Sequence, residues 1–222
     1  VISIASNEIL SETRPLSEKG YGMCVGRPIC DTHVEILKIT DDPITALHDR
    51  LKVQENEVGE ITVKADLVTH HYFNNREADL LAKIEDPDGS VWHRMGDLGW
   101  RDSKGRIWFC GRKGHRVTMT GQTLYTIPVE AIFNNHEKVY RSALAGVGPK
   151  NNQIPVMFVE PAGPIKNKKE FLRELRELGK SNPLTESIEH IFIEKAFPVD
   201  IRHNSKIFRE KLAVKARKKL GM

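Results

Sequence analysis

Two neighbouring stretches of the sequence carry residue types that could grip a small polar molecule. Residues 93–99 contain Gly96 followed by Asp97, and residues 111–117 contain Arg112. A glycine before an aspartate allows a turn of the backbone that aims the carboxylate into a cavity. An ionised carboxylate only accepts hydrogen bonds, so it can hold the two hydroxyls of a vicinal diol. The structural alternative is an aspartate in an ordinary surface turn.

The order of several short blocks adds to this pattern. The blocks are residues 58–63 with 72–74, residues 93–97, Gly111-Arg112, the stretch from Gly121 to Glu130, and residues 204–207. Together they resemble the acyl-adenylate-forming superfamily of acyl-CoA synthetases, luciferases and peptide-synthetase adenylation domains. The resemblance covers nearly the whole chain and implies that it is the C-terminal portion of such an enzyme.

The resemblance implies roles for three residues. Asp97 would hold the ribose hydroxyls of ATP and then of the acyl-adenylate, with Arg112 nearby on the nucleotide side. Lys206 would be the lysine that the small domain brings to the site during adenylation. A mobile ammonium can bridge a carboxylate oxygen and the α-phosphate as charge shifts between them. The structural alternative for Lys206 is one more solvated lysine of the basic tail.

The superfamily also has a hinge, about which its small domain rotates between two poses. The matching position is Gly114, two residues after Arg112, where the family usually has Asp or Lys. Glycine tolerates large backbone changes, so a hinge is still expected, without a charged side chain. Met95 and Ser205 also differ from the family's usual threonine and glycine.

Two parts of the family's site have no match here: its phosphate loop and the block whose Glu helps to hold Mg²⁺. The chain also begins at Val1 rather than Met. We therefore expect ATP and Mg²⁺ as cofactors with most ligands upstream, and no adenylation without the missing N-terminal part of the same chain. No metal site is expected on these residues themselves.

Four longer strings resemble one subgroup of the superfamily: residues 12–16, 20–28, 108–113 and 197–206. They look like the β-lactone synthetases of bacterial olefin biosynthesis, which implies a fatty or β-hydroxy fatty acid as substrate. One alternative is a fatty acyl-CoA ligase, in which Lys113, His115 and Arg116 supply cations for coenzyme A. Another is a non-catalytic interaction domain that has kept only the fold.

Other groupings have simpler interpretations. The spacing of Cys24, Cys30 and His33, with two histidines further on, fits no common structural zinc pattern. Tryptophans recur every eight residues from Trp92 to Trp108, which favours packing in a hairpin over a base-stacking platform.

The elements that must position these residues change in kind along the chain. Strands are predicted at 34–39 and 58–64, and a hairpin at 100–110. Further on, strands at 115–119, 142–146, 155–159 and 188–193 alternate with helices at 128–135, 168–178 and 206–220. The predicted fold is α+β: a β-rich C-terminal part of a large domain, residues 1–112, followed by a small α+β lid domain, residues 113–222.

Composition excludes several classes. The 222 residues carry 34 Lys and Arg against 30 Asp and Glu, a mild excess that does not predict a nucleic-acid partner. No stretch is long and apolar enough for a membrane span. Three cysteines form no paired framework, which favours a reducing compartment and thus the cytoplasm.

Overall fold

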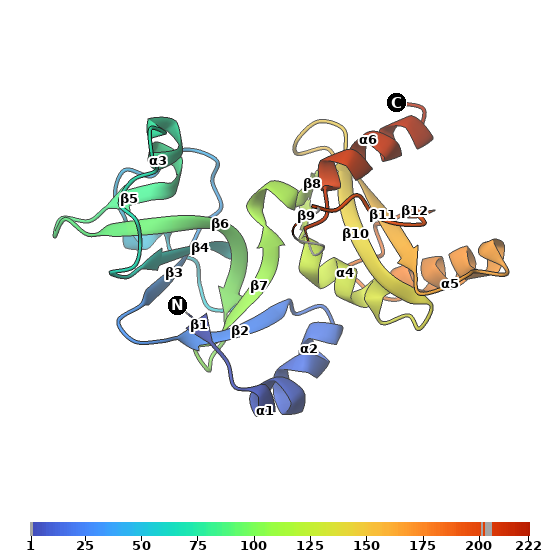
Figure 1. The fold of residues 1–222 in the computed structure, drawn as a ribbon, viewed down its shortest axis with the longest axis horizontal. Coiled ribbons are helices and arrows are strands. Elements are labelled where there is room, and N and C mark those ends of the chain that lie inside the picture. The colour runs from blue at the N-terminus through green and yellow to red at the C-terminus, as the bar shows by residue number, and fades with distance from the viewer. Residues whose placement is uncertain (1, 201, 203–205) are drawn as a thin grey trace. The chain divides into compact units, whose positions relative to one another are not determined.

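The computed structural model describes residues 2–200, 202 and 206–222. The chain divides into two compact units (Figure 1). The first comprises Val1–Pro15 and Gly22–Gly114, and the second comprises Leu16–Tyr21 and His115–Met222. The mixed α+β class is confirmed, whereas the domain bounds 1–112 and 113–222 stay a prediction.

The first unit is built on an antiparallel sheet with strand order β1-β2-β7-β6-β4-β3, in which β5 pairs with β6. The strands are β1 (Ile2–Ser3), β2 (Met23–Pro28), β3 (His33–Leu37), β4 (Gly59–Lys64), β5 (Lys83–Glu85), β6 (Val91–Arg101) and β7 (Ile107–Arg112). Alternate apolar residues of β3, β4 and β7 form one core cluster. The predicted hairpin is confirmed: β6 and β7 flank a turn at 102–105.

Short helical segments complete this unit. They are α1 (Ser6–Glu8), the π-helix η1 (Ile9–Thr13), the start of α2 (Arg14–Glu18), the 3₁₀ turn η2 (Asp49–Leu51) and α3 (Arg76–Ala82). The Asn75 side chain caps α3 by accepting the Ala78 amide at 3.1 Å, which satisfies one of the free amides of its first turn.

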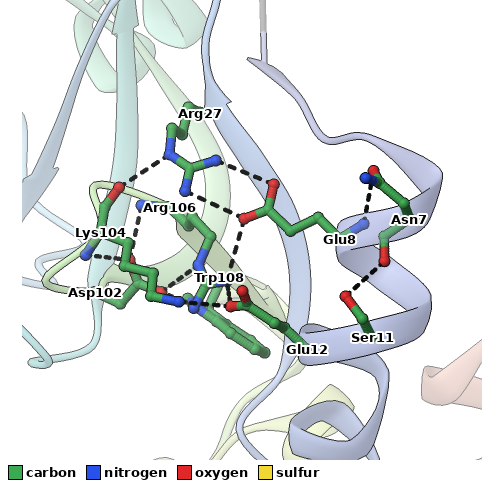
Figure 2. A network of polar contacts seen from close by, with 9 residues as sticks. All are labelled: Asn7, Glu8, Ser11, Glu12, Arg27, Asp102, Lys104, Arg106 and Trp108. Carbon is green, nitrogen blue, oxygen red and sulfur yellow. Dashed lines mark hydrogen bonds and ion pairs between the residues drawn. The ribbon is translucent and has the colours of Figure 1, made fainter.

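A polar network fastens the N-terminal helices to the β6–β7 turn (Figure 2). Asp102 lies at its centre, where its Oδ2 accepts from Trp108 Nε1 at 2.9 Å and from Arg106 Nε at 2.7 Å. Arg106 in turn reaches Glu8 at 3.2 Å and Glu12 at 2.9 Å.

The Glu8 carboxylate also accepts hydrogen bonds from both terminal nitrogens of Arg27, each at 3.1 Å (Figure 2). The Arg106 side chain is 6% exposed, so this is a nearly desolvated cation with three acidic partners. The network holds the chain ahead of β2 against the hairpin that carries the second predicted site stretch.

The second unit has a three-stranded sheet, with β10 (Val139–Val147) antiparallel and β12 (His190–Ile193) parallel to the central β11 (Ile154–Pro161). A separate hairpin pairs β8 (Val117–Met119) with β9 (Gln122–Leu124). Side chains alternate across the sheet, so α4 (Thr126–Asn134) and α5 (Lys168–Lys180) pack on one face and α6 (Arg209–Lys219) on the other (Figure 1).

The three predicted helices of this unit are present, but their bounds differ from the prediction: α4 begins at Thr126 and not at 128, and ends at Asn134 and not at 135, and α6 ends at Lys219 and not at 220. The last helix begins at Arg209, not at 206, because Ile207 pairs back with Val199 in an isolated bridge. Helix α5 does not end at 178, before Gly179, but runs through this glycine to Lys180. A Cβ at Gly179 would lie 3.1 Å from Phe133, so this glycine serves close packing of α5 on α4.

Candidate active site

Asp97 lies inside β6 rather than in a loop. Gly96 before it has φ +67°, the left-handed conformation that glycine adopts at little cost, so the backbone changes direction locally within the strand without forming the expected turn. Across the ladder, Asp97 faces Arg112 of β7. Arg112 Nη1 is 3.1 Å from Asp97 Oδ1 and donates to the Met95 carbonyl at 2.9 Å. The structure thus brings two of the predicted site residues together.

The environment of Asp97 differs from that of an ordinary surface aspartate. Its side chain is 21% exposed, while that of Arg112 is 59% exposed. Burial raises the pKa of the Asp97 carboxyl, Arg112 acts against this rise, and the nearby Glu60 adds to it. The carboxylate keeps free acceptor positions beside a cation, an arrangement that can hold hydroxyl donors of a nearby ligand.

A buried ion pair lies near this site. Glu60 of β4 and Arg94 of β6 are joined at 2.7 Å and 3.1 Å, with side chains 2% and 1% exposed. Arg94 also donates to the carbonyls of Thr40, Asp42 and Leu81 at 2.7, 2.8 and 3.0 Å. All five guanidinium N–H donors are therefore used, which is what a buried charge requires.

Lys113 joins the same pair. Its Nζ lies 3.0 Å from Glu60 Oε2 and donates to the Thr40 carbonyl at 3.1 Å. The contact fixes the residue that follows Arg112 and precedes Gly114. Sequence reasoning gave Glu60 no role, although a charged residue among the apolar residues of β4 was the available signal.

Gly114 is open to substitution in this conformation. Its φ is not in the left-handed region, and a Cβ built there would meet no atom within 4 Å. Nothing in the local packing thus requires glycine at the predicted hinge.

Lys206 lies in the second unit. Its side chain is 65% exposed, and its Nζ is 3.9 Å from Asp200 Oδ2. Asp200 donates its amide to the Lys206 carbonyl at 3.0 Å, so the two residues face each other in a short hairpin. Residues 201 and 203–205, which belong to the string 197–206, lie outside the described part.

The other groupings read from the sequence are separate from Asp97. Among the described residues, no group of three His, Cys, Asp or Glu side chains is placed to hold a metal ion. Trp92 and Trp108 are buried. The rings of Trp108 and Trp100 stack with their centroids 5.3 Å apart, in agreement with the packing interpretation. A hollow of about 830 Å³ beside α3 is lined by neither Asp97 nor Arg112.

No helix in the described part of the chain has the length and apolarity needed to cross a membrane.

No protein-family model matches the chain. The sequence is 43% identical over 219 residues to an olefin beta-lactone synthetase of Xanthomonas campestris pv. campestris, and 41% identical over 217 residues to that of Stenotrophomonas maltophilia. Each alignment covers 96% of this chain and 39% of the relative, so the chain spans well under half of these proteins.

Solved structures share the fold. The o-succinylbenzoate CoA synthetase of Bacillus subtilis, solved with its acyl-adenylate intermediate, matches with a TM-score of 0.70 at 21% identity, over 94% of this chain and 37% of that enzyme. The same enzyme has been solved with ATP and a magnesium ion, and that structure matches with a TM-score of 0.65 at 22% identity, over 85% of this chain and 35% of that enzyme.

Proposed function

Since the chain belongs to the acyl-adenylate-forming ligases, as their C-terminal portion, we propose that the whole protein activates a β-hydroxy fatty acid with ATP and closes it to a β-lactone. The observation that carries the proposal is the identity of 43% and 41% to olefin beta-lactone synthetases along 96% of the chain. We place the protein in the cytoplasm, where three free cysteines are stable.

In the first half-reaction the carboxylate attacks the α-phosphorus of ATP, giving acyl-AMP and pyrophosphate. We assign Asp97 to the ribose hydroxyls, since its carboxylate has acceptor positions left beside Arg112. Arg112 orients that carboxylate and adds positive charge on the nucleotide side. The described residues offer no set of metal ligands, so Mg²⁺ would be held by the rest of the ligase, which would also supply the phosphate loop.

We assign Lys206 to the developing charge between the substrate carboxylate and the α-phosphate. Its exposed ammonium has one carboxylate neighbour among the described residues, Asp200 at 3.9 Å. Only this weak ion pair has to be given up before the ammonium reaches a ligand. A preorganised cation at that point lowers the barrier by electrostatic stabilisation.

In the second half-reaction the β-hydroxyl oxygen of the substrate attacks the acyl carbon, the bond from that carbon to the AMP oxygen breaks, and the hydroxyl proton is released. Attack within one molecule has a large effective molarity, so no external thiol is needed. The alternative is thioester formation with coenzyme A. Lys113 is less suited to bind coenzyme A phosphates than the sequence suggested, because its Nζ is held by Glu60.

The test is pyrophosphate release by the full-length protein with long-chain 3-hydroxy and plain fatty acids, each with and without coenzyme A. We expect turnover of 3-hydroxy acids without coenzyme A, and a loss of about 100-fold in Lys206→Ala. Lys218→Ala, which removes another exposed lysine, is the matched control and should retain activity. A requirement for coenzyme A would replace the lactone reaction by thioester formation, and absence of pyrophosphate release would favour a non-catalytic domain.

A further inference from the structure

Lys206 sits in a hairpin between β12 and α6 whose two sides are joined by backbone contacts. Phe208 donates its amide to the Pro198 carbonyl at 2.8 Å, and Asp200 donates to the Lys206 carbonyl at 3.0 Å. We call residues 198–200 and 206–208 the lysine hairpin. Its position on the second unit depends on what holds its two ends.

The C-terminal end is held by a buried ion pair. Arg209, the first residue of α6, donates hydrogen bonds to both carboxylate oxygens of Glu130 in α4. The Arg209 Nη2 atom lies 3.0 Å from Glu130 Oε2. Glu130 Oε1 also accepts the Leu144 amide at 2.7 Å, and Arg209 donates to the Leu144 carbonyl at 3.0 Å. The Glu130 side chain is 8% exposed. These contacts tie the first residue after the hairpin to α4 and β10 at once.

The N-terminal end is held by a second carboxylate. Glu160 of β11 accepts the amide of Phe197, the residue before the hairpin, at 2.9 Å. Arg141 of β10 donates to the same oxygen of Glu160 at 2.9 Å. Each end of the lysine hairpin is thus fixed to the sheet by an acid that is paired with an arginine.

Apolar contacts attach α6 to the sheet in addition to the Arg209 pair. Leu212 and Ala216 are fully buried and pack with Ala143 and Phe158 on that face of the sheet. A buried ion pair contributes little net stability compared with apolar residues of the same size. The bidentate pair also fixes the orientation of Arg209 relative to Glu130, because a planar guanidinium can donate two hydrogen bonds to a carboxylate only over a narrow range of positions.

We propose that Glu130 and Arg209 are positioning residues that set where the lysine hairpin presents Lys206 for adenylation. The inference rests on the proposed function. Only Ile207 and Phe208 separate Lys206 from Arg209. A displacement of the Arg209 backbone therefore also displaces Lys206. Misplacement of a catalytic group by about 1 Å can cost about 100-fold in rate.

The test compares the two half-reactions in the full-length protein carrying Glu130→Gln or Arg209→Lys. Pyrophosphate release should fall about 10- to 100-fold in kcat with little change in KM for ATP. Conversion of supplied acyl-adenylate to product should stay within about twofold of wild type, because Lys206 serves only the first step. In a Lys206→Ala background, Glu130→Gln should cause no further loss.

The matched control is Thr185→Val, which removes another buried hydrogen bond of the second unit, from Thr185 Oγ1 to the Gly179 carbonyl. It should lower the thermal midpoint without separating the half-reactions. Equal losses in both half-reactions, or additive losses with Lys206→Ala, would overturn the positioning role while leaving adenylation itself established. Absence of pyrophosphate release from wild type would instead remove the proposed function, and this inference with it.

Discussion

At the scale of single residues, the pKa of Asp97 is set by opposing influences. Burial raises the pKa of its carboxyl and Arg112 opposes the rise. The pairing across β6 and β7 holds both side chains in register, so neither has to be ordered when a ligand arrives.

This environment makes nucleotide binding pH-dependent. We expect Asp97→Asn to weaken AMP binding about 10- to 100-fold, since hydrogen bonds to a charged group contribute roughly 1.5–3 kcal/mol. Because the pKa of Asp97 is raised, its charge is present above that pKa and is lost, as pH falls, earlier than that of an exposed aspartate. Wild-type affinity should therefore fall on acidification while the variant changes little, as measured by calorimetry on the full-length protein.

Asp66→Asn provides the control, because Asp66 is an exposed aspartate of the same unit. A variant at Asp97 that bound AMP as tightly as wild type would remove Asp97 from the nucleotide site.

At the scale of elements, the β6–β7 hairpin carries Asp97 on one strand and Arg112 on the other, and its turn is fastened by Asp102. Burial by itself would raise the pKa of Asp102, but hydrogen bonds from Trp108 and Arg106 hold it below its ordinary value. The same carboxylate therefore stabilises the turn and its attachment to the N-terminal helices.

Asp102→Asn should lower the free energy of unfolding by about 3 kcal/mol, because it leaves the buried Arg106 without its central partner. Since the pKa of Asp102 is depressed in the fold, its contribution is complete above its unfolded pKa and is lost as pH falls through the folded one. The difference from wild type in urea unfolding should therefore be largest near neutral pH and shrink below about pH 4.

The comparison for this experiment is Asp49→Asn, whose side chain is 96% exposed and which should change stability by no more than about 0.5 kcal/mol. If both variants lost the same small amount, the network of Figure 2 would be no more than surface charge.

At the scale of the whole molecule, the chain folds as two units, and the last residue of the first is Gly114. The side chain of Lys113, the residue before Gly114, contacts the buried Glu60 at 3.0 Å. The recognition of the ligase family from the order of its blocks is confirmed by the comparisons, and the hinge stays a prediction.

Gly114→Ala should leave both half-reactions within about twofold of wild type, because a Cβ meets no atom there and φ is compatible with alanine. Gly114→Pro fixes φ near −65° and should slow by at least about tenfold the half-reaction that needs the other pose. The two half-reactions are measured separately, as pyrophosphate release and as consumption of supplied acyl-adenylate. Wild-type rates for both steps in the proline variant would move the hinge elsewhere.

Several features were determined by the sequence itself. The spacing of Phe171, Leu172 and Leu175 specified α5, since helical periodicity is a local property. The turn at 102–105 specified the hairpin, and Gly96 before Asp97 specified a left-handed residue. The family could be recognised because the short blocks of its site follow one another along this chain in the same order as in the family.

Only the tertiary structure decided which charges meet. Glu60 and Arg94 are 34 positions apart, and Glu130 and Arg209 are 79 apart. No periodicity records such a pair, because each partner is chosen by the packing of whole strands and helices. The start of α6 at Arg209 was also decided by the tertiary structure, because backbone pairing of residues 206–208 with residues 198–200 keeps them out of the helix.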